Sequence, residues 1–280
     1  MSNERSSIII SVFSTTPGIG KTVTAINIAA ELAKDGYGVC LVDLDLQFGD
    51  VMNYLQLNAD SYINIATAQQ ELQEDPDTFN VTDFLVNYNY DNINFSVLPP
   101  SNYIHDAYQI DVYAVESIIN SLNYFEFVIL DLNSVYNALN LAMLVISTII
   151  NFIGIIDFLP ALKNFKIGYE TLLRFEYEES KIRLIENRAD SQKLIKEKDV
   201  ERLIGEPFYH RLSNDFPAVT KSIKEGRPLM FAAPNSRLTA DFSRLVGKYT
   251  NRKEAFALEA ENDKKEGFFS KYLNSFFKFN

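Results

Sequence analysis

The stretch SVFSTTPGIGKTVTAINIAAELA, residues 11–33, decides the fold. Apolar residues from Ser7 to Phe13 predict a strand, and Thr22 to Lys34 follow with helical spacing that ends near Gly36. Between them, Gly18-Ile19-Gly20-Lys21-Thr22 supplies glycines for a tight loop, a lysine for outer phosphates and a hydroxyl for magnesium. Because a helix N-terminus attracts phosphate, this strand, loop and helix predict a phosphate-binding loop.

Two more apolar runs end in carboxylates. Val39–Leu44 leads into LVDLDLQFGDV, where Asp43 and Asp45 lie on one side if the strand continues. Phe127–Leu130 leads directly into Asp131, which can hold a magnesium ion through water. Since parallel sheets bind ligands at the carboxyl ends of their strands, we expect all three motifs to meet at one edge.

The alternation of strands and helices predicts an α/β fold with a mostly parallel sheet and helices on both faces. Further strands are expected at Asn94–Leu98, Asn151–Ile156 and Ile182–Ile185, and surface helices and loops at residues 60–94. The apolar run Ala138–Ile156 approaches the length of a membrane span. Its polar and β-branched residues favour a short helix followed by a buried strand.

Composition limits the function classes. With 280 residues and 47% hydrophobic content, the chain can form one large domain. A net charge of −11 and a pI near 4.8 oppose broad binding to nucleic acid. The single Cys40 lies in an apolar run, and His105 and His210 are far apart, so neither a disulfide within the chain nor a zinc site is expected. The N-terminus has no signal-peptide pattern, so we expect a cytoplasmic protein.

With these motifs, the sequence resembles the ParA/MinD superfamily of deviant Walker ATPases, which are P-loop NTPases, over roughly residues 7–250. LVDLDLQFGDV and the later FYHRLSNDFPAVTKSIKEGRPLMFAAPNSRL are similar to the TadZ/CpaE pilus-assembly branch. The resemblance implies an ATP-dependent homodimer, with ATP and Mg²⁺ between the subunits, that marks a place in the cell.

The resemblance also assigns roles to residues. Lys21 matches the phosphate-binding lysine, Asp45 the residue that positions the attacking water, and Asn187 a position that often contacts adenine. The implied cofactor-binding set is Pro17, Gly18, Ile19, Gly20, Lys21, Thr22, Val23, Asn187 and Arg188, and the implied metal set is Thr22, Asp43 and Asp131. Lys21 and Asp45 form the implied catalytic pair.

The loop departs from the family pattern Lys-Gly-Gly-x-Gly-Lys-Thr. Thr16 occupies the place of the signature lysine, which reaches the partner subunit's phosphates, and Thr15 replaces a glycine. Pro17 removes one N–H from the phosphate cradle. Since one lost electrostatic donor often costs about 3–4 kcal/mol of transition-state stabilisation, we expect slow or absent hydrolysis unless another cation substitutes. Leu132-Asn133-Ser134 also departs from the family, in which prolines are common there.

After the domain over residues 1–250, we expect two further regions: a charged helix or linker over 251–266 and an amphipathic helix over 267–280. On a helix, bulky apolar residues fill one half of the circumference and polar residues the other. The implied membrane-binding set is Phe268, Phe269, Lys271, Tyr272, Leu273, Phe276 and Phe277. This segment resembles the membrane-targeting tail of MinD; the alternative is a terminal helix packed on its own domain or on a partner protein.

These features predict an ATP-binding, dimerising spatial regulator on the inner face of the cell membrane. It would recruit a partner machinery for pilus or secretion assembly, or for cell division. One alternative is a DNA-associated partition ATPase of the ParA kind, whose candidate basic residues would be Lys193, Lys196, Lys198, Arg202 and Arg211. Another is a catalytically dead adaptor that uses the same fold.

Overall fold

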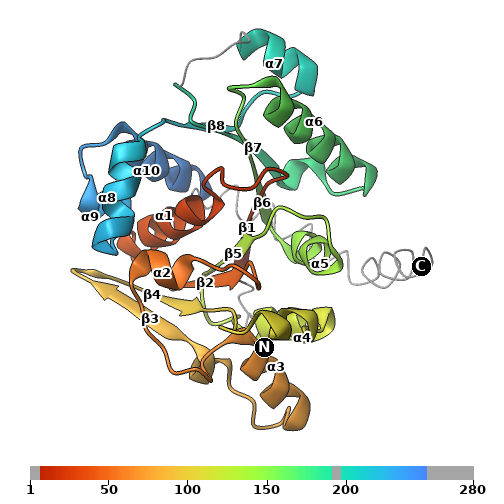
Figure 1. Ribbon diagram of the computed structural model, residues 1–280, viewed down its shortest axis with the longest axis vertical. Helices are drawn as coiled ribbons and strands as arrows, with labels where there is room; N and C mark the ends of the chain where they lie inside the picture. The colour runs from red at the N-terminus through yellow and green to blue at the C-terminus, as the bar shows by residue number, and fades with distance from the viewer. Residues whose placement is uncertain (1–6, 191–196, 251–280) are drawn as a thin grey trace, which may run out of the picture.

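A twisted sheet forms the centre of the molecule (Figure 1). The computed structural model describes residues 7–190 and 197–250. Within these residues the sheet has eight strands in the order β3-β4-β2-β5-β1-β6-β7-β8, parallel except for β3. The strands are β1 (Ile8–Phe13), β2 (Val39–Leu44), β3 (Val86–Tyr90), β4 (Ile93–Leu98), β5 (Phe127–Leu132), β6 (Ile149–Gly154), β7 (Ile182–Asn187) and β8 (His210–Leu212).

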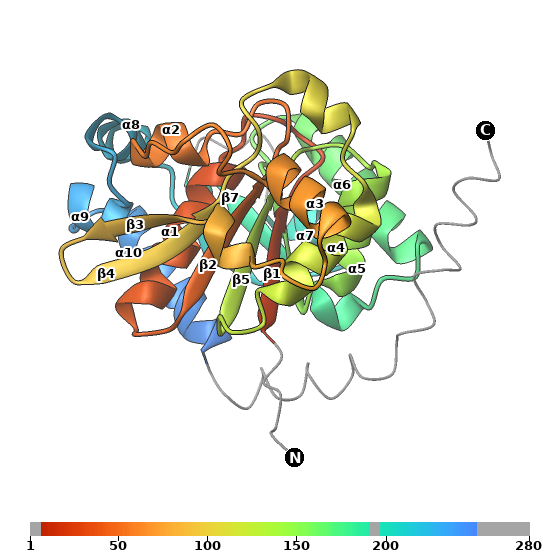
Figure 2. The ribbon, with the colours of Figure 1, turned by 90° about the horizontal axis from the view of Figure 1, so that it is seen from below.

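Helices cover both faces of the sheet. One face carries α1, α8, α9 and α10, and the other carries α3, α4, α5 and α6 (Figure 2). The helices are α1 (Lys21–Lys34), α2 (Val51–Leu55), α3 (Ile65–Glu74), α4 (Val112–Ser121), α5 (Ala138–Ile146), α6 (Leu159–Arg174), α7 (Glu197–Ile204), α8 (Phe216–Glu225), α9 (Leu229–Ala232) and α10 (Arg237–Tyr249). Short 3₁₀ turns are η1 (Val81–Phe84), η2 (Ile104–Tyr108) and η3 (Glu179–Lys181).

Each face of the sheet has its own apolar core. On the α1 side, alternate residues of β1 and β2 such as Ile10, Val12 and Leu41 pack under α1 and α10. On the opposite side, Phe13 and Val42 pack under the helices from α3 to α6. Strands β2, β5 and β6 are buried at every position because they are covered on both faces. This explains their continuous apolar runs.

The strand register brings the three sequence motifs together. Strand β5 lies between β1 and β2, and Asp131 is the register partner of both Val12 and Asp43. Because the strands are parallel, the loop after β1 and the segments after β2 and β5 leave the sheet at the same edge. The carboxylates predicted near a metal therefore lie beside the glycine loop.

The expected α/β fold class is confirmed. The expectation that the apolar run Ala138–Ile156 is a helix followed by a buried strand is also confirmed. Its residues form helix α5 followed by strand β6, and no described helix is long and apolar enough to cross a membrane. Two strands were missed. Strand β3 falls in the region assigned to helices and loops, where Val86 and Tyr88 are buried and Asn87 and Asn89 are exposed. Because asparagine is uncommon in strands, the sequence of this segment predicts a strand only weakly. The segment forms a strand because it pairs with β4.

The second missed strand, β8, is only three residues long, too short for a periodic signal. Expected strand ends were also shifted by one or two residues, as for β6, which begins at Ile149. The predicted charged segment 251–266 and amphipathic helix 267–280 lie outside the described residues.

Candidate functional site

The glycine loop between β1 and α1 has the backbone shape that the sequence predicts. Gly18 has φ +70° and Gly20 has φ +95°, a region that favours glycine because it has no Cβ. Thr15 is not among the described residues with positive φ, so its branched side chain is compatible with its backbone. Ile19 is buried and anchors the loop.

The loop leaves a row of backbone N–H groups without protein acceptors. Within the described part of the chain, the N–H groups of residues 18–22 donate no hydrogen bond to protein, whereas Thr24 already bonds to the Gly20 carbonyl at 3.0 Å. These are the free donors of the helix N-terminus, and they point where the helix dipole attracts anions. The arrangement fits a phosphate group.

Two N–H groups are missing from this row. Ser14 Oγ accepts from the Thr16 N–H at 2.9 Å and donates to the Thr16 carbonyl at 3.2 Å. Pro17 has no N–H at all. The buried Ser14, which sequence analysis did not single out, thus occupies one donor of the loop in this structure. The phosphate cradle therefore begins at residue 18.

Thr15 ties the loop to helix α6. Its hydroxyl donates to the Asn164 carbonyl at 2.9 Å. A Cβ on Gly168 would lie 2.4 Å from Thr15 Cγ2, so glycine at 168 makes room for the threonine. No sequence motif predicts this contact, because Asn164 and Gly168 belong to an otherwise ordinary helix. It explains how the loop accommodates threonine in place of glycine.

Lys21 lies inside the site and is held by a neutral partner. Its Nζ donates to Ser134 Oγ at 2.7 Å, in the segment after β5. Burial lowers the pKa of Lys21, while the nearby Asp131 and Asp45 oppose that shift. A half-desolvated ammonium beside a hydroxyl would gain energy from an anion, since a charged acceptor makes a stronger hydrogen bond.

Thr22 and Asp131 form the pair that best fits a magnesium ion. Thr22 Oγ1 donates to Asp131 Oδ2 at 2.6 Å, and the buried Asp131 Oδ1 has no hydrogen-bond partner. Burial raises the pKa of Asp131 to about 7, although Thr22 and Lys21 oppose the shift. A buried carboxylate oxygen without a partner is costly, so a cation or a water held by one would stabilise it.

Asp43 is fully buried next to Asp131 and organises its own loop. It accepts the N–H groups of Asp45 and Val51, each at 3.1 Å, and Gly49 packs closely against it. Burial, followed by the nearby Asp131, raises the pKa of Asp43 well above its usual value. The structure places Asp43 beside Asp131, and two of its lone pairs are already used by backbone.

Asp45 lies just beyond β2 and faces the lysine. Burial raises its pKa, and Lys21 is the largest opposing influence. In the described residues no group of three or more His, Cys, Asp or Glu side chains could hold a metal ion. A magnesium ion here would take Thr22 and Asp131 from the protein, and phosphate and water oxygens would complete its shell. The structure thus brings the predicted residues Lys21 and Thr22 of the loop close to the predicted carboxylates Asp45 and Asp131.

A cavity of about 180 Å³ adjoins the loop on the side of β7 and α8. Asn187 Nδ2 donates to the Ile19 carbonyl at 2.5 Å, and an Arg188 guanidinium N–H donates to the Gly18 carbonyl at 3.2 Å. Apolar side chains, among them Val23 and Phe216, form other parts of the wall. The predicted cofactor-binding residues Asn187 and Arg188 therefore lie beside the loop, and both also brace its backbone.

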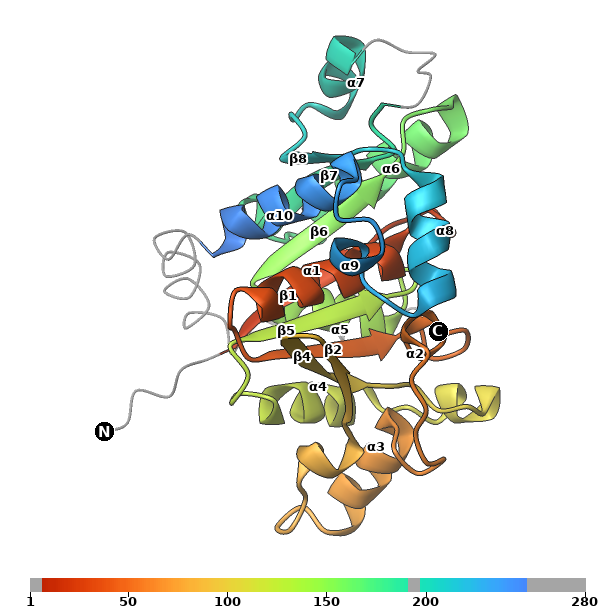
Figure 3. The ribbon, with the colours of Figure 1, turned by 90° about the vertical axis from the view of Figure 1, so that its left-hand side faces the viewer.

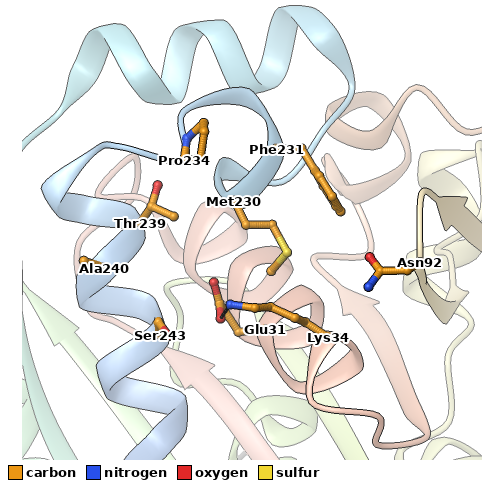
Figure 4. Close-up of a pocket in the computed structure, with 9 residues that line it drawn as sticks. All are labelled: Glu31, Lys34, Asn92, Met230, Phe231, Pro234, Thr239, Ala240 and Ser243. Atoms are coloured by element: carbon orange, nitrogen blue, oxygen red, sulfur yellow. Dashed lines mark hydrogen bonds and ion pairs between the residues drawn. The ribbon is translucent and has the colours of Figure 1, made fainter.

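A larger cavity of about 340 Å³ lies at the other end of α1 (Figure 4). Glu31 and Lys34, from the last turns of α1, form an ion pair of 3.2 Å beside Met230 and Ser243. Burial raises the pKa of Glu31. Since an α-helix rises 1.5 Å per residue, this cavity is about 20 Å from the loop and does not belong to the phosphate site.

Comparisons with known proteins agree with this geometry. Residues 10–229 match the model of the CobQ/CobB/MinD/ParA nucleotide binding domain family. A ParA family ATPase from Chlorobium tepidum superposes with a TM-score of 0.76 at 21% identity, covering 86% of this chain and 98% of that chain.

Two archaeal structures are similar to about the same degree. The cell division ATPase MinD of Pyrococcus furiosus has a TM-score of 0.72 at 22% identity, covering 86% of this chain and 97% of its own. MinD of Pyrococcus horikoshii, solved with Mg-ADP, has a TM-score of 0.72 at 18% identity, with coverages of 88% and 97%. A search of curated proteins found no match.

The buried carboxylates predict a pH dependence of stability. Because burial raises the pKa of Asp131 to about 7 and that of Asp43 in the same direction, both bind protons more tightly in the folded chain. Their contribution is fully present below about pH 4 and is lost as the pH rises through 7. In urea unfolding without nucleotide, Asp131→Asn should flatten this fall, which we expect to be on the order of 1–3 kcal/mol.

Asp83→Asn is the control, because Asp83 is exposed on η1, and it should keep the wild-type slope. An unfolding free energy that rises between pH 4 and 7 by the same amount in wild type and in Asp131→Asn would contradict the burial argument.

Proposed function

Because this chain belongs to the CobQ/CobB/MinD/ParA nucleotide-binding domain family, we propose that it binds ATP with Mg²⁺ and works as a dimerising spatial regulator. The observation that carries the proposal is the convergence of free N–H groups at residues 18–22 with the Thr22–Asp131 pair, whose Asp131 Oδ1 has no partner. Anion donors and a cation acceptor side by side are what a metal-bound phosphate chain requires.

In this proposal, nucleotide binding is coupled to the segment after β5. Lys21 Nζ leaves Ser134 Oγ and donates to a phosphate oxygen, which frees Ser134 and the residues around it to move. Thr22 and Asp131 would hold a bound Mg²⁺, which would neutralise charge on the phosphates. Asn187 and Arg188 line the cavity that would take the base.

Hydrolysis is proposed to be slow because the cation at position 16 is missing. The segments that follow β2, β4, β5 and β6 before α6 contain no lysine or arginine, so none of them can replace it. Lys163 is exposed on α6, next to Asn164, whose carbonyl contacts Thr15. We propose Lys163 as the substitute cation that supports the residual turnover.

The cellular role follows the family resemblance and the tail pattern. The protein would dimerise with ATP, attach to anionic membrane through residues 267–280, and recruit a pilus, secretion or division partner. A DNA-associated role is less well supported, because Arg211 already pairs with Glu186 at 3.0 Å and Glu201 at 2.8 Å. An adaptor that binds no nucleotide would leave Asp131 Oδ1 without a function.

ATP binding should raise thermal stability. A ligand that binds only the folded state stabilises it by RT ln(1 + [L]/Kd), or about 2.7 kcal/mol at one hundred times Kd. We expect Mg-ATP to raise the melting temperature of the wild type by several degrees. Lys21→Ala should abolish this shift, and the matched control Lys221→Ala, on the exposed part of α8, should retain it. No shift in the wild type would overturn nucleotide binding.

Restoring the signature lysine should accelerate hydrolysis. Since one electrostatic donor is worth about 3 kcal/mol, Thr16→Lys should increase phosphate release by roughly 10²-fold. Lys163→Ala should lower the residual rate, while Lys166→Ala, one turn along α6, should not. Fast wild-type turnover that depends on Lys21 but is unchanged by Thr16→Lys would refute the argument.

Membrane attachment should depend on the tail and on nucleotide. Wild-type protein with Mg-ATP should sediment with vesicles containing anionic lipid, and a variant that ends at residue 266 should stay in solution. Phe276→Glu provides a full-length test of the apolar face. Equal sedimentation of the truncated and complete chains would remove the tail from the mechanism.

A further inference from the structure

The charges of this protein are separated along the chain. Residues 35–162 contain no lysine and no arginine, although they hold 17 of the 37 acidic residues. The rest of the chain has all 26 basic residues and 20 acidic ones, a net charge of +6. The net charge of −11 is therefore the sum of a strongly acidic segment, residues 35–162, and a mildly basic remainder of the chain. Such a division produces a directional field that can steer charged partners.

The structure gathers much of the acidic segment into one lobe. It is built on α3 and α4, which pack against each other in the lower part of Figures 1 and 3, with η1 beside α3 and η2 leading into α4. Gln69 joins its elements, donating to the Gln109 carbonyl at 3.1 Å and accepting the Asp111 N–H at 2.7 Å. Exposed carboxylates of the lobe and its approaches are Asp60, Glu74, Asp75, Asp77, Asp83 and Asp111.

These carboxylates have almost no counter-charge of their own. Among the described residues 60–116, the one contact between a basic ring and a carboxylate is that of His105 Nε2 with Asp106 Oδ1 at 3.0 Å, which is an ion pair only when the imidazole is protonated. Exposed like charges repel one another, and salt weakens this repulsion with distance. A cationic partner would relieve this repulsion, so the lobe complements positive charge.

An apolar surface accompanies the charge. Tyr103, Ile104, Tyr108 and Tyr113 are 57%, 49%, 77% and 53% exposed on η2 and the first turn of α4. We call these four residues the tyrosine face. Exposed isoleucine and tyrosine side chains are not needed for solubility. Covering their apolar surface with a partner would gain about 25 cal/mol per Å². Tyrosine rings also attract guanidinium and ammonium groups.

We propose that the tyrosine face and the carboxylates of the same segment, the exposed Asp111 and the partly buried Asp106, form a docking surface for a lysine- and arginine-rich segment of a partner protein. Carboxylates draw the segment in and pair with its cations, and the tyrosine rings cover its side-chain stems and stack on its guanidinium groups. The four residues are outside the phosphate site, and the surface does not require bound nucleotide. The inference therefore stands independently of the proposed nucleotide function.

The test is fluorescence anisotropy with a labelled peptide of six Arg-Ser repeats, and a peptide of six Glu-Ser repeats as its negative control. We compare the complete wild-type chain with a triple variant, Tyr103→Ser, Tyr108→Ser and Tyr113→Ser, which keeps the charge unchanged. The matched control is Tyr124→Ser, which is 51% exposed after the other end of α4. Urea unfolding of every variant checks that each is folded, and titrations run without nucleotide.

The wild type should bind the arginine peptide and not the glutamate peptide, with affinity falling about tenfold or more between 50 and 300 mM salt. The triple variant should bind about fivefold or more weakly, and Tyr124→Ser within about twofold of wild type. Equal binding by a folded triple variant would overturn the proposal, since general acidity would then explain it. Self-association of the wild type that the triple variant loses would assign the face to a second copy and also overturn it.

Discussion

Two carboxylates buried side by side are the constraint on which the site depends. Strands β2 and β5 pair in a register that sets Asp43 against Asp131, and the two residues are at most 1% exposed. Neighbouring strands are about 4.8 Å apart, so two full charges would repel by roughly 3 kcal/mol at an effective dielectric of 20. Protonation, the Thr22 hydroxyl and the Lys21 ammonium reduce that cost in the free protein. A divalent cation next to the phosphate loop would do so more completely.

Contacts with the rest of the protein explain the unusual residues in the first half of the phosphate-binding loop. Thr15 bonds to α6, and Ser14 closes a small turn over Thr16, so the first half of the loop is fixed by protein contacts. The second half keeps its free N–H groups and its positive-φ glycines. The loop has therefore kept what is needed to hold phosphates while lacking the cation at position 16. A stable bound state with slow turnover is what the proposed spatial regulator requires.

Sequence reasoning predicted the fold class, and it predicted that the glycine loop and the strand-end carboxylates lie together, because both predictions rest on local patterns. The glycine loop and the two strand-end carboxylates are short motifs, and parallel topology alone brings them together. Ser14, Ser134 and Asn164 could not be found this way, because their roles depend on packing between segments far apart in the sequence. Strand β3 was missed because its Asn-rich sequence forms a strand only through pairing with β4.

The most direct test of the central claim is a crystal structure with Mg²⁺ and a non-hydrolysable ATP analogue. The account predicts phosphate oxygens within hydrogen-bond distance of the N–H groups of residues 18–22, and Mg²⁺ bound to Thr22 Oγ1. Asp131 should then face the metal directly or through one water, and Lys21 Nζ should have left Ser134. A structure at saturating analogue in which Lys21 still bonds to Ser134 and the loop holds no phosphate would contradict the account.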